Sequence, residues 1–428
     1  MQLLKNKQAI YLLFAANSVS GFSQGISIIA IPWYFSNVIN QPSVFGYVYF
    51  SITFISLFWG IYAGSLIDRY NRRNIFIANS VAGCLIILSI ALSGFMLGSV
   101  PAALVAVAFA TTFFIFNIHY PNLYAFCQEI SDPKDYSRIT SYIEIQGQVT
   151  TALAGAVAGI LLTGTEEGHL NMFGFHLDVA FQMAPWTIKE ILVLDGSTYI
   201  VAIILILLIR FTPVQYREPD YTSVANRVRT GLQYLRRNPM LLIFGITSYA
   251  IFITILVLIF FLLPVYIDSH LNGQADVYGA AEMYFAIGSV GAGIAVNYIF
   301  RNTTTVKAII IMTITATAIY FIYIFNTYIP LFYMLYFLLG MSNAGTRVMR
   351  MTYLLNHVPN DIIGRASSVL NVAGVFFRLL FIIVCATPFF MNNNNVVWAF
   401  LMFGCFTMLS AIVLMINYSK MIGAHTYR

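Results

Sequence analysis

Charged residues are scarce in this sequence. Only 9% of its 428 residues are Asp, Glu, Lys or Arg, whereas 59% are hydrophobic and the mean hydropathy is +0.80. A soluble domain is usually about half apolar and a quarter charged. The chain has too little polar surface to cover a water-soluble core of its size, which excludes an ordinary soluble protein.

Motifs for metal binding and hydrolysis are also missing. There is no CxxC pair; Cys84, Cys385 and Cys405 lie within apolar runs and Cys127 ends one, where cysteine acts as a small apolar side chain. There is no Walker loop, GxSxG or HExxH motif. We therefore expect no disulfide, metal site, cofactor or ATP hydrolysis, and no enzyme.

Long apolar runs are what the sequence does contain. Each of twelve is long enough for a membrane-spanning helix, and none alternates in the short units of a barrel. They lie near residues 9–39, 44–67, 74–97, 100–127, 139–163, 194–212, 240–268, 276–300, 306–326, 329–355, 362–390 and 395–418. The first is far longer than the apolar part of a signal peptide. The sequence predicts an all-α, polytopic membrane protein with twelve transmembrane helices.

The basic residues predict the topology of these helices. Short loops rich in Lys and Arg stay in the cytoplasm. If the N-terminus is cytoplasmic, 20 of the 22 Lys and Arg residues fall in cytoplasmic loops or at cytoplasmic helix ends. Of the other two, Lys189 falls outside and Arg378 lies within a helix. Both termini are therefore predicted to be cytoplasmic. Topology also accounts for the net charge of +6, so no nucleic-acid partner is needed to explain it.

The two halves of the chain resemble each other. The stretches "DPKDYSRITSYIEIQGQ" and "VPNDIIGRASSVLNVAGV" align at an offset of 227, with three identities: Arg138 and Arg365, Ser141 and Ser368, Gly147 and Gly374. "IPWY" and "LPVY" match around Pro32 and Pro264, and "VFG" matches "VYG" beyond them. The alternative is that these matches arise by chance, because a few apolar residue types make up most of the sequence. A duplication of six helices is typical of secondary transporters, whose sites lie near the midplane.

This repeat predicts three parts. Residues 1–212 form an N-terminal six-helix bundle, with an external loop at 164–193 expected to hold an amphipathic surface helix. Residues 213–239 form a cytoplasmic linker, and "SVANRVRTGLQYLRRN" within it predicts a basic amphipathic helix on the inner membrane face. Residues 240–428 form the C-terminal six-helix bundle.

"GSLIDRYNRR", between the second and third runs, resembles the signature loop of the major facilitator superfamily. The matching residues are Gly64, Leu66, Asp68, Arg69, Arg72 and Arg73. Asn71 replaces the usual glycine, and because Asn tolerates positive φ we expect the turn to persist. The alternative, a plain positive-inside loop, explains the arginines but not Asp68 or Gly64.

The resemblance implies a conformational latch made by Gly64, Asp68, Arg69, Arg72 and Arg73. Gly64 would permit close helix packing. Asp68 would lie at the start of the eleventh helix, near residues 360–364, and interact with its helix dipole.

A narrower resemblance concerns the branch of the superfamily. "NSVSGFSQGISIIAIPWY", "GLQYLRRNPML" and "VPNDIIGRASSV" resemble the enterobactin exporter and macrolide efflux proteins, which implies export. Two features depart from proton-coupled drug exporters: "LAGAVAG" lacks their Gly-Pro pair in helix 5, and "FFIFNIHYPNL" lacks an arginine in helix 4. These departures leave the coupling mechanism open.

Two ionisable residues inside predicted helices are candidate functional groups, because charges in the membrane are costly. Arg378 has no local partner in sequence and is a candidate cavity cation for an anionic substrate, or a partner of Glu144. It could instead snorkel or be paired internally. Glu144 is the proton-coupling candidate, because a buried carboxylate can exchange protons near neutral pH. The alternative is an interfacial glutamate paired with Arg138 or Arg350.

Uncharged polar residues complete the predicted cavity. They are Asn17, Ser20 and Gln24 in helix 1, which share one face with Ser27, Asn117 and His119 in helix 4, Asn343 in helix 10 and Asn371 in helix 11. The alternative is hydrogen bonding between helices. Arg347 and Arg350 are expected to be positive-inside anchors at the inner end of helix 10.

Together these observations predict a secondary active transporter that works by alternating access. By resemblance it is a monomeric, proton-coupled exporter of a small amphipathic or anionic molecule, siderophore-like or drug-like, in the bacterial inner membrane. An importer or facilitator of a small polar metabolite remains open. So does a non-transporting membrane sensor or assembly partner, although no large soluble effector domain is present.

Overall fold

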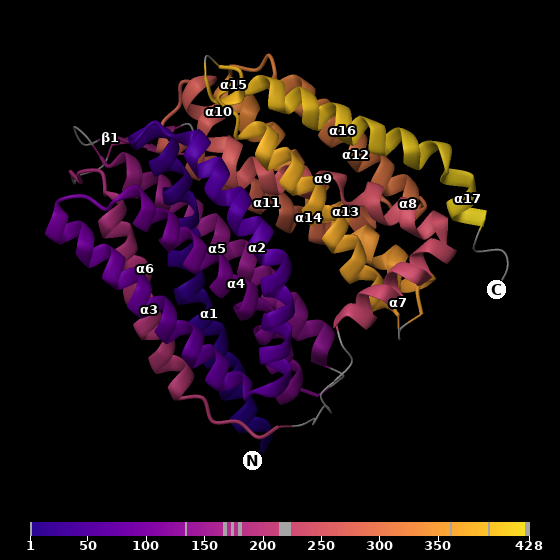
Figure 1. The fold of residues 1–428 in the computed structure, drawn as a ribbon, viewed down its shortest axis with the longest axis horizontal. Helices are drawn as coiled ribbons and strands as arrows, with labels where there is room; N and C mark the ends of the chain where they lie inside the picture. The colour runs from indigo at the N-terminus through magenta and orange to yellow at the C-terminus, as the bar shows by residue number, and fades with distance from the viewer. Residues whose placement is uncertain are drawn as a thin grey trace. The chain divides into compact units, whose positions relative to one another are not determined.

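A computed structural model describes residues 2–132, 135–165, 169–172, 175–178, 182–213, 224–359, 362–392 and 394–423. Long helices make up most of the described chain, with one short hairpin of two strands (Figure 1). The protein is an all-α polytopic membrane protein, as predicted.

The described residues of the first half of the chain form seven helical segments and two strands. These are α1 (Gln2–Trp33), the π-helical turn η1 (Tyr34–Val38), α2 (Pro42–Arg69), α3 (Arg72–Leu97), α4 (Ala102–Ile130), α5 (Tyr136–Thr163), β1 (His169–Met172), β2 (Phe175–Asp178) and α6 (Ile188–Leu207).

The second half begins with an amphipathic helix and continues with broken spans. Its segments are α7 (Val224–Arg237), α8 (Pro239–Ser248), α9 (Ala250–Val257), η4 (Leu258–Leu262), α10 (Leu263–Ser269), α11 (Ala275–Ile299), α12 (Thr305–Tyr323), α13 (Ile329–His357), α14 (Ile363–Cys385), α15 (Pro388–Met391), α16 (Val397–Ile416) and α17 (Tyr418–Gly423). Segments α8, α9, η4 and α10 together form one apolar stretch, Pro239–Ser269.

Eleven helical stretches of the described chain are long and apolar enough to cross a membrane, one fewer than the twelve predicted. The difference is α13, which has 29 residues but is not among the eleven. Its second half carries Asn343, Arg347 and Arg350, which lower its hydropathy. Arg350 is buried, whereas Asn343 and Arg347 are half-buried.

The chain divides into two compact units. Unit 1 comprises Met1–Gln41, Ser51–Tyr221 and Ala275–Met283; unit 2 comprises Pro42–Phe50, Thr222–Gln274 and Tyr284–Arg428. The first residues of α2 thus belong to unit 2, and the first residues of α11 belong to unit 1. Each unit therefore includes a short segment from the other half of the sequence.

Helix α1 organises unit 1. It packs against α4, α5 and α6, and α3 lies alongside α6 (Figure 1). Apolar side chains from α1, α3, α4, α5 and α6 form one buried cluster, including Leu13, Phe76 and Phe126. Helix α3 ends at Gly98, whose φ of 83° is in the left-handed region that glycine adopts without strain.

Unit 2 has a separate core around α12, which packs against α13 and α16. Helix α7 is the amphipathic helix expected in the linker, and its apolar side packs against α14. Leu235 is buried in the core. A Cβ at Gly231 would overlap the carbonyl oxygen of Arg365, so the two backbones approach closely there.

Glycines also bring membrane helices together in both units. In unit 2, a Cβ at Gly288 of α11 would overlap the carbonyl oxygen of Phe337, and one at Gly340 of α13 would overlap that of Phe285. In unit 1, a Cβ at Gly279 would overlap the carbonyl oxygen of Gly155. These helices approach backbone to backbone, as small residues allow in membrane bundles.

The segment 164–193 differs from the amphipathic helix that we predicted. Strands β1 and β2 pair antiparallel, from His169 opposite Asp178 to Met172 opposite Phe175, and a bridge joins Thr165 to Met183. Gly164, with a φ of 73°, ends α5. Gly168 and Gly174 lower the helix propensity of the segment by about 1 kcal/mol each relative to Ala, and Pro185 lies just before α6 begins at Ile188.

Candidate functional site

The loop between α2 and α3 is held by a helix cap rather than by a left-handed turn. Asn71 has a φ of −59°, and its side chain accepts hydrogen bonds from the backbone N–H groups of Arg73 (3.0 Å) and Asn74 (3.3 Å). The expectation that Asn71 serves the turn through positive φ is therefore wrong. Asn is present because it is among the best N-cap residues, and it satisfies N–H groups that the first turn leaves free.

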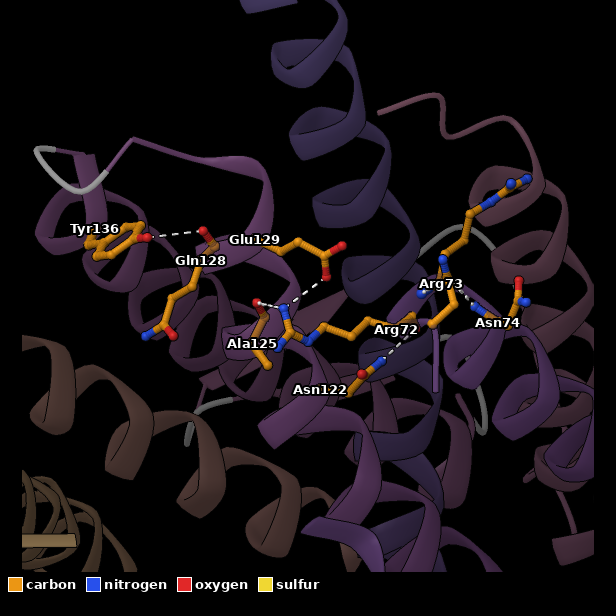
Figure 2. A network of polar contacts seen from close by, with 9 residues as sticks. Arg72, Arg73, Asn74, Asn122, Ala125, Gln128, Glu129 and Tyr136 are labelled. Atoms are coloured by element: carbon orange, nitrogen blue, oxygen red, sulfur yellow. Dashed lines mark hydrogen bonds and ion pairs between the residues drawn. The ribbon is translucent and has the colours of Figure 1, made fainter. Parts of the chain in front are cut away.

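Arg72 ties the start of α3 to the end of α4 (Figure 2). Its Nη1 forms an ion pair with Glu129 at 2.8 Å and donates to the carbonyl of Ala125 at 3.1 Å. The side chain of Asn122 donates in turn to the carbonyl of Arg72 at 2.9 Å. Charge-assisted bonds of this kind are short and directional, so they fix the geometry of the loop.

The side chain of Arg73 extends away from that of Arg72 (Figure 2). It binds a different helix, α6. It donates to the carbonyls of Ile206 (Nε, 3.1 Å) and Leu207 (Nη2, 2.6 Å) at the end of α6. The Ile206 carbonyl also accepts from the backbone N–H of Ile209 at 3.1 Å. A positive charge at the C-terminal end of α6 interacts favourably with the helix dipole. The two neighbouring arginines thus fasten α3 to α4 and to α6 within unit 1.

The other predicted latch residues form fewer contacts. Gly64 and Arg69 are exposed, and a Cβ at Gly64 would meet nothing within 4 Å among the described atoms. The structure therefore shows no close helix packing at Gly64. The side chain of Asp68 and residues 360–361 lie outside the described part of the chain, and so does their predicted contact.

A polar network joins α1, α4 and α5. Asn17 donates to Oε1 of Gln146 at 3.2 Å, and its Oδ1 lies 2.7 Å from Nε2 of His119. Gln146 donates to the carbonyl of Phe14 at 2.6 Å and to the hydroxyl of Ser18. Two predicted residues, Asn17 and His119, therefore meet. Gln146 was not among the candidates, although it lies two residues from Glu144.

The remaining uncharged candidates have separate surroundings. Gln24 donates to Ser20 within α1 at 2.7 Å, and Asn117 donates to the carbonyl of Phe113 in its own helix at 2.8 Å. In unit 2, Asn343 is half-buried on α13 and Asn371 is exposed on α14.

Glu144 is exposed on α5, not buried as its selection as a proton-coupling candidate assumed. It accepts a hydrogen bond from the hydroxyl of Tyr124 on α4 at 2.8 Å. Arg138, one of its suggested partners, donates instead to the hydroxyl of Tyr142 at 2.8 Å. Arg378 is half-buried on α14, and its Nε is buried without a hydrogen-bond partner among the described residues.

Arg350, which we expected to be a positive-inside anchor at the inner end of helix 10, is instead buried among aromatic and backbone groups. It is 5% exposed, and its guanidinium carbon lies 3.6 Å from the centre of the Tyr249 ring. Its Nη1 donates to the carbonyl of Ser248 at 3.1 Å. That carbonyl is the last of α8, before the one-residue break at Tyr249, which the sequence does not reveal.

Asp195 is an intramembrane carboxyl that sequence analysis missed. It is 0% exposed in α6 and accepts a hydrogen bond from the hydroxyl of Ser27 on α1 at 2.8 Å. Its Oδ1 and the hydroxyl of Tyr199 are buried without partners among the described residues. The apolar run placed Asp195 at a helix end, but α6 begins two turns earlier, at Ile188.

We predict that Ser27→Ala destabilises unit 1 by about 1–3 kcal/mol, because it removes the hydroxyl donor from a buried carboxyl. Thermal unfolding of the purified protein in lipid measures the effect. Ser197→Ala is the matched control, since among the described residues Ser197 donates to the carbonyl of Leu194 in its own helix. Equal melting temperatures for the two variants would show that the Ser27–Asp195 contact contributes little.

Comparisons with known proteins match this architecture. The family model described as Major Facilitator Superfamily matches residues 13–382. No curated protein matches the chain.

Solved structures of several transporters share the fold. They include the nucleoside transporter NupG, with a TM-score of 0.68 at 12% identity, over 96% of this chain and 99% of that one. A bacterial homologue of the iron transporter ferroportin has a TM-score of 0.70 at 12% identity, over 95% and 98% of the two chains. A D-xylose-proton symporter has a TM-score of 0.66 at 13% identity, over 95% and 97%. At these identities the likeness establishes the fold.

Proposed function

Because this chain belongs to the Major Facilitator Superfamily, we propose that it is a proton-coupled exporter of a small amphipathic or anionic molecule. It is a multi-pass membrane protein of transporter type, not an enzyme. The proposal places it as a monomer in a bacterial inner membrane, with both termini cytoplasmic. Siderophore-like and drug-like molecules are the first substrates to test.

The proposal of an anionic substrate rests on Arg378. Arg378 lies on a membrane helix with a buried Nε that has no hydrogen-bond partner in the described chain. A guanidinium in the membrane is costly unless an anion or a polar group compensates it. An anionic group on the substrate would supply that compensation, so Arg378→Ala should weaken substrate binding even without a gradient.

Proton coupling is proposed for Glu144. Its carboxylate is held by the Tyr124 hydroxyl between α5 and α4, and proton movement is the simplest energy source for a chain without an ATP site. The D-xylose-proton symporter among the structural neighbours supports coupling on this fold. It also favours the second candidate function, import of a small polar metabolite.

Inside-out vesicles with an imposed proton gradient test the proposal. Export predicts that an amphipathic or organic anion accumulates inside them and that the gradient is required. Matched vesicles carrying the Arg378→Ala variant are the control. Accumulation only in right-side-out vesicles would favour import, and no gradient-dependent transport in either orientation would favour a sensor or assembly partner.

We predict that Asp68→Asn slows transport and leaves membrane insertion intact, as expected for a residue of the conformational latch. A charge near a helix terminus contributes about 0.3–1 kcal/mol when exposed and up to about 2 kcal/mol when partly buried. The ratio of conformational states should then change by about two- to thirtyfold. Labelling of cysteines introduced at the two ends of the transport path measures that ratio; an unchanged ratio in the variant would rule out the latch.

A further inference from the structure

Unit 2 carries a large excess of positive charge. Its segments contain twelve Lys and Arg but only two acidic residues, Asp268 and Asp361, whereas unit 1 contains ten basic and fourteen acidic residues. Among the described residues of unit 2, arginines on α13 and α14 therefore have few carboxylates with which to pair. Buried cations need such a partner or another anion.

Arg350 is the most buried of these arginines. The Tyr249 ring covers one face of its guanidinium, and the Ser248 carbonyl accepts one N–H. Its Nε is buried and has no hydrogen-bond partner in the described chain. A cation–π contact and one neutral carbonyl compensate only part of the lost hydration of a guanidinium.

Thr346 adds a second unpartnered donor, one turn earlier on the same face of α13. It is 2% exposed, and its Oγ1 is buried with no partner within the described residues. Hydroxyls in helices usually donate to a carbonyl of the preceding turn. Here a hydroxyl and a guanidinium N–H at positions i and i+4 are both unused.

Tyr249 links this pair to α14. A Cβ at Gly374 would lie 3.5 Å from Cδ1 of Tyr249, so the tyrosine contacts α14 there. Arg378 follows Gly374 by one turn on the same face of α14, and its Nε is the third unpartnered donor. Both α13 and α14 pack against the α8–α9 segment that carries Tyr249.

We propose that Thr346 and Arg350 form an oxyanion-binding site, which takes the carboxylate or phosphate group of a small solute. A hydroxyl and a guanidinium N–H are matched donors for such oxygens, and a charge-assisted bond would satisfy the buried Nε. The site deepens the proposed function by naming the substrate's chemical group. Its existence requires neither export nor proton coupling, and binding can be measured without transport.

Thermal unfolding of the full-length protein in nanodiscs tests the site. The probes are citrate and inorganic phosphate against chloride at equal ionic strength, in discs of zwitterionic lipid. We expect citrate or phosphate to raise the melting temperature and Arg350→Gln to weaken the apparent affinity about tenfold or more. Arg301→Gln is the matched control: Arg301 also lies over a tyrosine ring but is exposed, and this variant should keep the full response.

If Arg350→Gln fails to fold, the variant Thr346→Val still tests whether the site binds anions. The hydroxyl forms no hydrogen bond with the described residues, so its loss should leave the melting temperature without anion unchanged or higher. The anion affinity should fall about three- to tenfold.

Several outcomes would overturn the site. The first is no response of the wild type to citrate or phosphate. The second is a full response in both Thr346→Val and Arg350→Gln; if Arg350→Gln does not fold, Arg350→Lys takes its place. Stabilisation by discs of phosphatidylglycerol, but by neither free anion, would assign the donors to a lipid headgroup and exclude the solute. Loss of proton-coupled transport with intact anion binding would contradict only the proposed export.

Discussion

Gly288→Ala should destabilise the protein severely, by about 1–3 kcal/mol or more, although it adds a single methyl group. The new Cβ would overlap the carbonyl oxygen of Phe337 and lie 2.9 Å from its carbonyl carbon. Backbone atoms cannot rotate away as a side chain can, so α11 and α13 would have to separate. Gly340→Ala meets Phe285 in the same way from the opposite helix and should behave alike.

Gly293→Ala, on the same helix α11, is the control for this prediction. A Cβ at Gly293 of α11 meets nothing within 4 Å of the described atoms. Because Ala is more favourable than Gly inside a helix by about 1 kcal/mol, Gly293→Ala should be neutral or stabilising. Melting temperatures of both variants in lipid discs measure the contrast. If Gly288→Ala melts no lower than Gly293→Ala, the close approach of α11 and α13 is wrong.

Glu144→Gln should abolish uphill accumulation of substrate while exchange between equilibrated compartments continues. One pH unit supplies about 1.4 kcal/mol per proton, and 100 mV adds about 2.3 kcal/mol. Coupling one proton to one neutral substrate can thus sustain a concentration ratio of several hundredfold. The variant should reduce that ratio to about one, because its amide cannot carry the proton. Counterflow and gradient-driven uptake in proteoliposomes measure the two activities separately.

Glu190→Gln is the control for a general effect of losing a carboxylate. Glu190 caps the start of α6 by accepting from the backbone N–H of Thr187 at 2.6 Å, so its role is structural and accumulation should persist. Continued uphill accumulation by Glu144→Gln would instead make Glu144 an interfacial residue, held by the Tyr124 hydroxyl for structural reasons.

Sequence alone predicted the architecture because membrane insertion constrains composition strongly. Long uncharged runs must become helices in a bilayer, where every backbone polar group needs an internal partner. Outside the apolar runs this constraint disappears, and there two of the predictions failed, although the amphipathic helix of the linker was predicted correctly. The described residues between α5 and α6 include a two-stranded hairpin, and Asn71 caps α3 instead of adopting positive φ.

The candidate site was only partly predictable, since residue type identifies a polar group but not its partner. Asn17 and His119 were recognised as intramembrane polar residues, yet Gln146 completes their network from α5. Asp195 escaped notice because hydropathy placed its helix start too late. Arg350 was taken for an anchor because the helix break at Tyr249, which supplies its carbonyl and its ring, leaves no clear signal in the sequence.

The segment exchange between the halves of the chain has a consequence for biosynthesis. Unit 1 includes Ala275–Met283, and Gly279 packs on Gly155 and Gly159 of α5. During translation, the N-terminal half emerges from the ribosome long before this segment exists. Until α11 is synthesised, lipid or the insertion machinery must therefore contact the α5 glycines in its place. A ribosome that stalls before Ala275 would leave a product whose first unit lacks Ala275–Met283, about two and a half helical turns, and leaves Gly155 and Gly159 of α5 uncovered.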